Sequence, residues 1–154
     1  MSRYDDALVE LRHVPLGQFV AERKRLAAEL AAAGDKAGSS LLAKHARPSV
    51  SVWAVNQLYV EASDDFDELF ETAARVRRGE LEAAAEHRKV TSKLTARAAK
   101  LLTDAGHGAS DATLRRVTST LSALKAAGGF EPDPPRTLGA DRDPPGFDAV
   151  GLKA

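Results

Sequence analysis

Apolar side chains recur every three or four residues along most of this chain, which is the spacing of one face of an α-helix. Proline and glycine divide the pattern into segments, because proline is disfavoured inside a helix and glycine commonly ends one. The pattern predicts seven helices, over residues 5–13, 15–33, 35–46, 50–60, 64–78, 80–105 and 111–127. We expect the last two helices to form a long antiparallel hairpin, since the short connection between them contains two glycines.

The segment from Val50 to Val60 differs from the others because apolar residues cover almost all of its faces. A helix that is apolar all round is usually buried. The Ser-Val-Ser-Val alternation at its start would also suit a short strand, but the chain offers no second strand-forming segment to pair with it. We therefore expect a buried central helix with Trp53 and Leu58 in the core, packed against the helix that carries Phe19.

The composition of the chain changes after residue 128. Five of the seven prolines lie beyond this point, which excludes a further long helix. We expect an all-α bundle of six to seven helices over residues 1–128 and an extended or disordered tail over residues 129–154, with Phe130 and Phe147 as candidate anchors.

Charge and cysteine content narrow the classes of function. The 22 basic and 22 acidic residues cancel, so the chain as a whole has no electrostatic attraction to nucleic acid. The absence of cysteine excludes disulfides, thiolate metal sites and cysteine nucleophiles. No apolar stretch reaches the length of a membrane span and no apolar leader begins the chain, so we expect a cytoplasmic protein that contacts no membrane.

The sequence also lacks the short motifs that are typical of common enzyme classes. It has no HExxH pair, phosphate-binding loop, nucleophile elbow or dinucleotide-binding glycine pattern. The four histidines are spread along the chain, and His87 falls on an apolar helical stripe, where we expect a packed core side chain. Ser49 and Ser51 near His45 lack the acid of a catalytic triad. We expect no catalytic residue, cofactor or metal.

Two segments resemble a bacterial, actinobacterial-type family of helical proteins. The first is the run VPLGQF at residues 14–19 followed by Arg23, and the second is RPSVSVWAVNQL at residues 47–58. The run Pro-Gly-Phe at residues 145–147 is also similar. The family has no known activity, so the resemblance implies that the two segments form one structural unit and implies nothing about function.

Two polar residues in these segments need partners. Arg23 shares a helix face with Phe19 and Leu26, and a buried guanidinium must be paired. It would serve either an anion or phosphate site or an ion pair with an acid, for which the candidates are Asp5, Asp6 and Glu61. Asn56 lies within the apolar segment and needs hydrogen bonds, from Arg23, a ligand or a partner chain. We expect Arg23 and Asn56 to form a buried polar pair that fixes helix packing.

Two charged faces stand out on neighbouring helices. A basic stripe follows the long helix and continues on the next one, and we define it by Lys89, Lys93, Arg97, Lys100, Arg115 and Arg116. An acidic face precedes it, and we define it by Glu61, Asp64, Glu68 and Glu71, with Asp65 and Asp67 beside it. A basic stripe can follow a phosphate backbone, although most such stripes are only solvated surfaces. The two faces could also dock on each other, within one chain or between two copies.

These patterns support three hypotheses about function. The first is a non-enzymatic interaction or regulatory protein that acts through protein–protein contacts, as a homo-oligomer or an adaptor. The second is a nucleic-acid-binding module that uses the basic stripe. The third is an enzyme with a small pocket near Arg23, Asn56 and His45, and the absence of a catalytic motif makes it the weakest of the three.

Overall fold

The computed structural model describes residues 2–145 and is all-helical, with no strand among these residues. The expected all-α class is therefore confirmed, and the segment around Ser51 is helical rather than extended. The α-helices are α1 (Arg3–His13), α2 (Phe19–Ala32), α3 (Lys36–Ala43), α4 (Val50–Glu61), α5 (Ser63–Arg77), α6 (Ala83–Asp104) and α7 (Asp111–Ala127), and a short 3-10 helix, η1, covers Leu16–Gln18.

The observed helices differ from the expected ranges mainly at proline and glycine. The helix expected from Pro15 begins with the 3-10 turn η1, in which Gly17 weakens regular helix formation. Helix α3 ends at Ala43, three residues before the expected end, and the segment 44–49 leads to α4. Pro48 in this segment disfavours a helical conformation for the residue before it.

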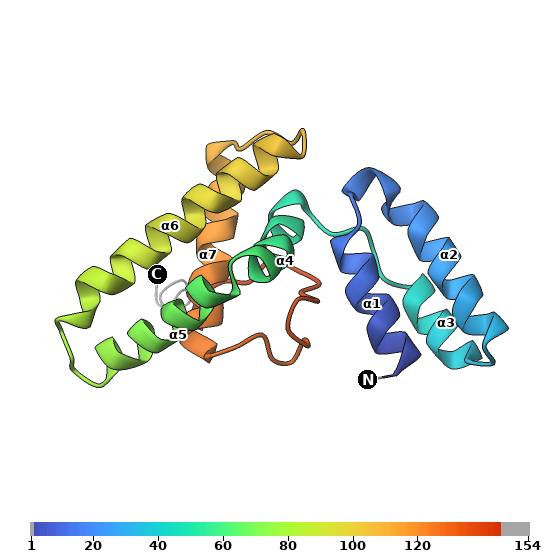
Figure 1. Ribbon diagram of the computed structural model, residues 1–154, viewed down its shortest axis with the longest axis horizontal. Helices are drawn as coiled ribbons and strands as arrows, with labels where there is room; N and C mark the ends of the chain where they lie inside the picture. The colour runs from blue at the N-terminus through green and yellow to red at the C-terminus, as the bar shows by residue number, and fades with distance from the viewer. Residues whose placement is uncertain (1, 146–154) are drawn as a thin grey trace, which may run out of the picture.

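The helices bury two separate hydrophobic clusters and so form two units (Figure 1). Helices α1, α2 and α3 make the N-terminal unit, whose core includes Leu11, Phe19 and Leu42. Helices α4 to α7 make the C-terminal unit, whose core includes Trp53 and Leu58. The three residues of the expected core motif are therefore buried, but Phe19 lies in a different cluster from the other two.

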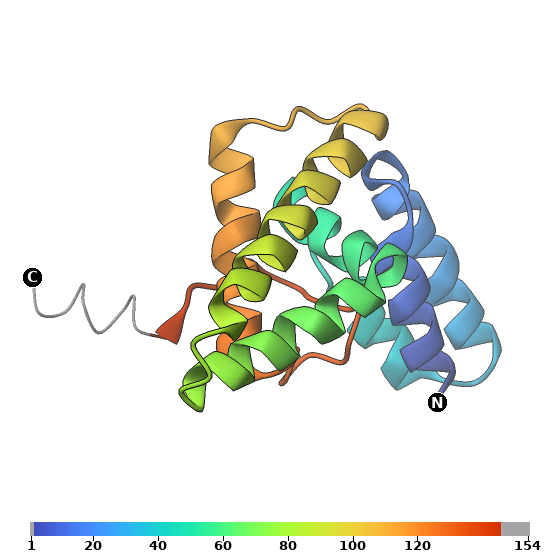
Figure 2. The same ribbon diagram turned by 60° about the vertical axis from the view of Figure 1, so that its left-hand side comes forward.

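Helix α4 occupies the centre of the C-terminal unit and contacts α5, α6 and α7. Figures 1 and 2 show α6 and α7 inclined to each other, with α4 packed against both. The expectation that α4 packs on the Phe19 helix is wrong, because α1 supplies the main contact of the N-terminal unit with α4. The buried character of α4 comes from its position among the helices of its own unit.

The chain after α7 is part of the packed structure as far as it is described. Residues 129–144 form a strap of turns and extended segments that crosses the C-terminal unit (Figure 2). Phe130 and Leu138 are buried in the same cluster as Trp53. The expected domain boundary at residue 128 therefore does not mark the end of the core. Phe147 lies outside the described residues.

Among residues 2–145, no helix is long and apolar enough to cross a membrane. Within the same range, no group of three or more histidine, aspartate or glutamate side chains is placed to hold a metal ion.

Candidate interface and the seam between the two units

The structure separates the two residues that we expected to form a buried polar pair. Arg23 is only half-buried, donates a hydrogen bond to the backbone carbonyl of His45 at 2.7 Å, and lies over the ring of Phe19. It forms no ion pair with another described residue, so the expected bond to Asp5, Asp6 or Glu61 is absent. The expectation of an Arg23–Asn56 pair is wrong, because each side chain satisfies its polar atoms elsewhere.

Asn56 is completely buried and bonds to the strap. Its Nδ2 donates to the carbonyl of Leu138 at 3.0 Å, and its Oδ1 accepts the backbone N–H of Leu138 at 2.9 Å. One amide side chain thus satisfies both backbone groups of a residue 82 positions away. Asn56 therefore fixes the position of the strap along α4.

The buried arginine of this protein is Arg12, which the sequence patterns did not single out. Its side chain is only 4% exposed, although it lies at the end of α1. A local signal was present, because Arg12 follows Leu8 by four residues and therefore shares the apolar face of α1. Its Nε and Nη1 atoms are sealed from solvent and have no hydrogen-bond partner. Burial lowers the pKa of the Arg12 guanidinium, with a smaller opposing effect of Asp133.

His45 joins the segment 44–49 to α1. Nη2 of Arg12 donates to Nδ1 of His45 at 3.0 Å, and Nε2 of His45 lies 2.8 Å from the Tyr4 hydroxyl. Burial, together with the charge of Arg12, lowers the pKa of His45. Burial also raises the pKa of Tyr4. The cluster Tyr4–His45–Arg12 closes one side of the N-terminal unit.

Three further hydrogen bonds connect the units along the seam between α1 and α4. The indole Nε1 of Trp53 donates to the carbonyl of Val14 at 2.9 Å, and Nε2 of Gln57 donates to the carbonyl of Arg12 at 3.0 Å. The ring of His13 lies 3.3 Å from the carbonyl of Asn56. Because the side chains of Trp53 and Gln57 bond to backbone carbonyls, the seam has a fixed register.

The basic stripe is exposed, but its central members are paired within the chain. Lys93 and Arg97 contact the carboxylate of Asp65 at 3.2 and 3.5 Å, and Lys100 contacts Asp104 at 2.8 Å. Asp65 itself is largely buried against α6. The remaining members of the stripe, Lys89, Arg115 and Arg116, are exposed and have no ion pair with a described residue.

The acidic face is solvent-exposed. Glu61, Asp64, Glu68 and Glu71 form no ion pair with a described residue, and the carboxylate that meets the basic stripe is that of the flanking Asp65. Glu61 contributes only its backbone carbonyl, which accepts a hydrogen bond from Arg97 at 3.3 Å. The two charged faces thus meet along one edge, where α5 packs on α6.

An open cleft of about 720 Å³ lies between α4 and the second half of α6. Its apolar lining comes from Trp53, Leu101 and Ala105, and its polar lining comes from Gln57, Glu61, Arg97, Lys100 and Asp104. Val60, which is 51% exposed, lies near the azimuth of Trp53 on α4, seven residues further along the helix. The cleft and Val60 together form what we call the α4–α6 surface.

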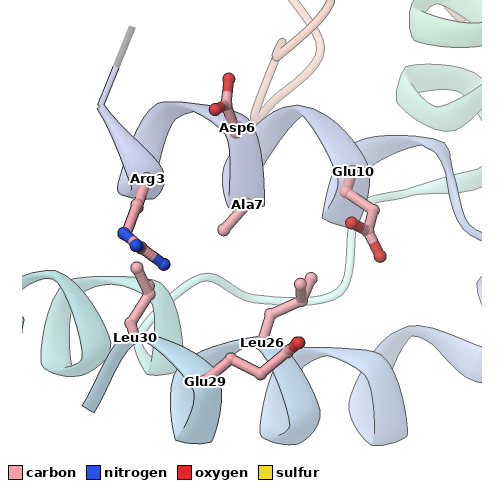
Figure 3. Close-up of a pocket in the computed structure, with 7 residues that line it drawn as sticks. All are labelled: Arg3, Asp6, Ala7, Glu10, Leu26, Glu29 and Leu30. Atoms are coloured by element: carbon pink, nitrogen blue, oxygen red, sulfur yellow. The ribbon is translucent and has the colours of Figure 1, made fainter. Parts of the chain in front are cut away.

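A smaller groove of about 210 Å³ lies between α1 and α2. Figure 3 shows Ala7 of α1 facing Leu26 and Leu30 of α2, with charged side chains at the edges of the groove. Arg25 of α2 joins the two helices through its ion pair with Glu10 of α1, and it also pairs with Glu22 and Glu29 on its own helix. The groove is smaller than the roughly 300–1,000 Å³ of typical ligand pockets, and we assign it to helix packing.

His87 is half-buried on the inner side of α6 and connects three helices. Nζ of Lys125 in α7 lies 2.8 Å from Nε2 of His87, and the other ring nitrogen lies 2.8 Å from the hydroxyl of Thr72 in α5. Burial and the charges of Lys125 and Arg77 lower the pKa of His87. Burial also lowers the pKa of Lys125. His87 is packed among three helices with both ring nitrogens bonded, but it is half-buried and not the core side chain that we expected.

Comparisons with protein-family models, with curated proteins and with solved structures find no match to this chain. The geometry of the chain itself is therefore the basis for the functional proposals below.

Proposed function

We propose that this chain is a non-enzymatic helical protein that acts through protein–protein contacts, and that a second copy of the chain docks on its α4–α6 surface. The observation that carries the proposal is a cleft lined by three apolar residues and five polar ones, with the half-exposed Val60 further along the same helix. Apolar groups in a concave surface are the usual centre of a protein interface, and polar groups form its rim.

The charges at the edge of the cleft favour a second copy as the occupant. They comprise two cations, Arg97 and Lys100, and two anions, Glu61 and Asp104. In a two-fold symmetric dimer the same patch meets itself, so the patch must be self-complementary. A balanced set of both signs among the lining residues meets this condition, whereas a surface of one sign would repel its copy.

A pair of matched substitutions tests the proposal. Val60→Glu places a charge beside the cleft, and Val20→Glu places the same charge on α2, at a residue of nearly equal exposure, 52% against 51%. Sedimentation velocity over a wide concentration range should show self-association of the natural chain and of Val20→Glu, and a monomer for Val60→Glu. A natural chain that remains monomeric at the highest concentration, or equal loss in both variants, would overturn the proposal.

The nucleic-acid alternative has less support from the described contacts. Three members of the basic stripe, Lys93, Arg97 and Lys100, already contact carboxylates of the same chain, which lowers the potential they present to a phosphate backbone. Binding of double-stranded DNA at about 50 mM salt, reduced in the double variant Lys93→Glu and Arg97→Glu, would favour this alternative over ours. The third hypothesis, an enzyme pocket near Arg23, Asn56 and His45, has the least support, because Arg23 bonds to the backbone of His45 whereas Asn56 bonds to the strap.

A further inference from the structure

The hydrogen bond between Arg12 and His45 defines the protonation state of the histidine ring. A guanidinium group can only donate, so Nδ1 of His45 must accept and cannot carry a hydrogen. A neutral imidazole then carries its hydrogen on Nε2, which donates to the hydroxyl oxygen of Tyr4. The closed arrangement of the cluster is therefore specific for the neutral ring.

Arg12 depends on this bond more than an exposed arginine would. The contact with His45 is the one side-chain hydrogen bond that Arg12 makes with the described residues, and its Nε and Nη1 atoms are sealed and unpartnered. No carboxylate of a described residue lies within the 4.0 Å of an ion pair with Arg12. A buried cation without partners is strongly disfavoured, so Arg12 must gain water when His45 stops accepting.

The charged and titratable groups around His45 come from three elements. Helix α1 contributes Arg12 and Tyr4, and α2 contributes Arg23, which bonds to the His45 carbonyl. The strap contributes Asp133, which attracts a proton to His45 but is already bonded to Arg142 at 2.9 Å. The nearest of these groups to a new proton on Nδ1 is the Arg12 cation, so a second positive charge would lie about 3 Å from the first.

We propose that His45 is a proton-operated latch beside the seam that holds Arg12 against the strap, closed while its ring is neutral and released when the ring gains a proton. Protonation removes the acceptor of Arg12 and adds a cation beside it. The arginine can regain hydrogen bonds only from water, and water reaches it when the segment 44–49 or the strap moves away from α1. The strap covers this region at Gly139. A Cβ added to Gly139 would lie 3.3 Å from Nη2 of Arg12, so the strap backbone is close to the guanidinium. Release at His45 therefore frees the Arg12 side chain to move away from Gly139 of the strap, which is where this cluster touches the C-terminal unit.

The latch can be tested by measuring the distance between the units. The chain has no cysteine, so the double variant Lys36→Cys and Lys89→Cys carries spin labels only at these exposed positions, on α3 and α6. Pulsed dipolar spectroscopy should give one narrow distance distribution at about pH 8 and a longer, broader one at about pH 5, below the ordinary histidine value near 6.5. Circular dichroism should show that the helices remain folded at both pH values. An unchanged distribution would overturn the proposal.

Two histidine variants separate the latch from general acid effects. His45→Gln keeps an acceptor for Arg12 and a donor for Tyr4 but cannot gain a proton, so the distance change should disappear. His87→Gln is the matched control, because His87 also accepts from a cationic side chain but lies within the C-terminal unit. This control should keep the full distance change. A change that persists in His45→Gln would refute the latch.

Nuclear magnetic resonance of the natural chain provides a test that needs no substitution in the cluster. Nitrogen-15 shifts of the His45 ring should show hydrogen on Nε2 and none on Nδ1 at about pH 8. Protonation of the ring should coincide with the change in inter-unit distance. Hydrogen on Nδ1 at about pH 8, or titration of the ring without a distance change, would overturn the proposal even if His45→Gln fails to fold.

Discussion

Replacing Asn56 with alanine removes both hydrogen bonds that hold the backbone of Leu138 against α4. Leu138 is fully buried, so water does not readily replace the lost side-chain partner. The substitution leaves one backbone N–H and one backbone carbonyl without a partner in the core. Each unsatisfied buried group costs about 1–3 kcal/mol, so we expect Asn56→Ala to lower the free energy of unfolding by about 2–6 kcal/mol. That loss is comparable to the whole stability of a marginal domain, which is about 5 kcal/mol.

In urea unfolding this loss appears as a lower midpoint concentration of urea. A smaller slope of the transition would show that the strap has already detached in the native state, because less surface then remains to be exposed. Gln57→Ala is the neighbouring control, since Gln57 makes one hydrogen bond, to the carbonyl of Arg12. We expect it to cost only about 0.5–1.5 kcal/mol. Amide hydrogen exchange at Leu138 should accelerate in Asn56→Ala and remain slow in Gln57→Ala. A loss below about 1 kcal/mol in Asn56→Ala, or unchanged exchange at Leu138, would refute this account of the strap.

Three further predictions concern stability. Asp65→Asn should cost about 1 kcal/mol at low salt and less at high salt, measured by urea unfolding, because two ion pairs with α6 are lost. Gly128→Ala should lower the melting temperature through a cost of about 1 kcal/mol at φ 79°, whereas Gly17→Ala, with open space around it, should not. Burial and Lys125 lower the pKa of His87, so the unfolded chain binds more protons and stability should fall as the pH drops below about 6.5. His87→Gln should reduce that fall in pH-dependent thermal unfolding, and an identical pH profile would contradict the assignment.

The helices could be predicted because their signals are local. Apolar spacing, prolines and glycines lie within the same few residues that form each helix, and the all-round apolar segment correctly indicated a buried α4. The packing partners of α4 could not be predicted in the same way. The bond from Asn56 to Leu138 spans 82 residues, and periodicity identifies which face is buried without identifying what covers it.

At the candidate site too, helical spacing did not show which segments cover a given side chain. Arg12 and Arg23 lie at comparable positions beside apolar residues of their helices, yet only Arg12 is buried, because the strap and the segment 44–49 cover the end of α1. Helical spacing placed the basic stripe on the surface, as observed. It did not identify Asp65 as the carboxylate that pairs with the stripe. Choosing among the neighbouring acids requires knowing where α5 and α6 cross.

The order in which the chain leaves the ribosome has different consequences for the two clusters. Every residue of the N-terminal cluster lies before residue 43, so that cluster can close before the C-terminal unit is complete. The C-terminal cluster needs Leu138, which emerges only after all seven helices have been synthesised. Until then, the amide of Asn56 lacks the backbone groups of Leu138 that satisfy it in the folded chain. We therefore expect a stage of synthesis with a folded first unit and a second unit that still lacks its strap, in which chaperones and proteases can reach the region around Asn56.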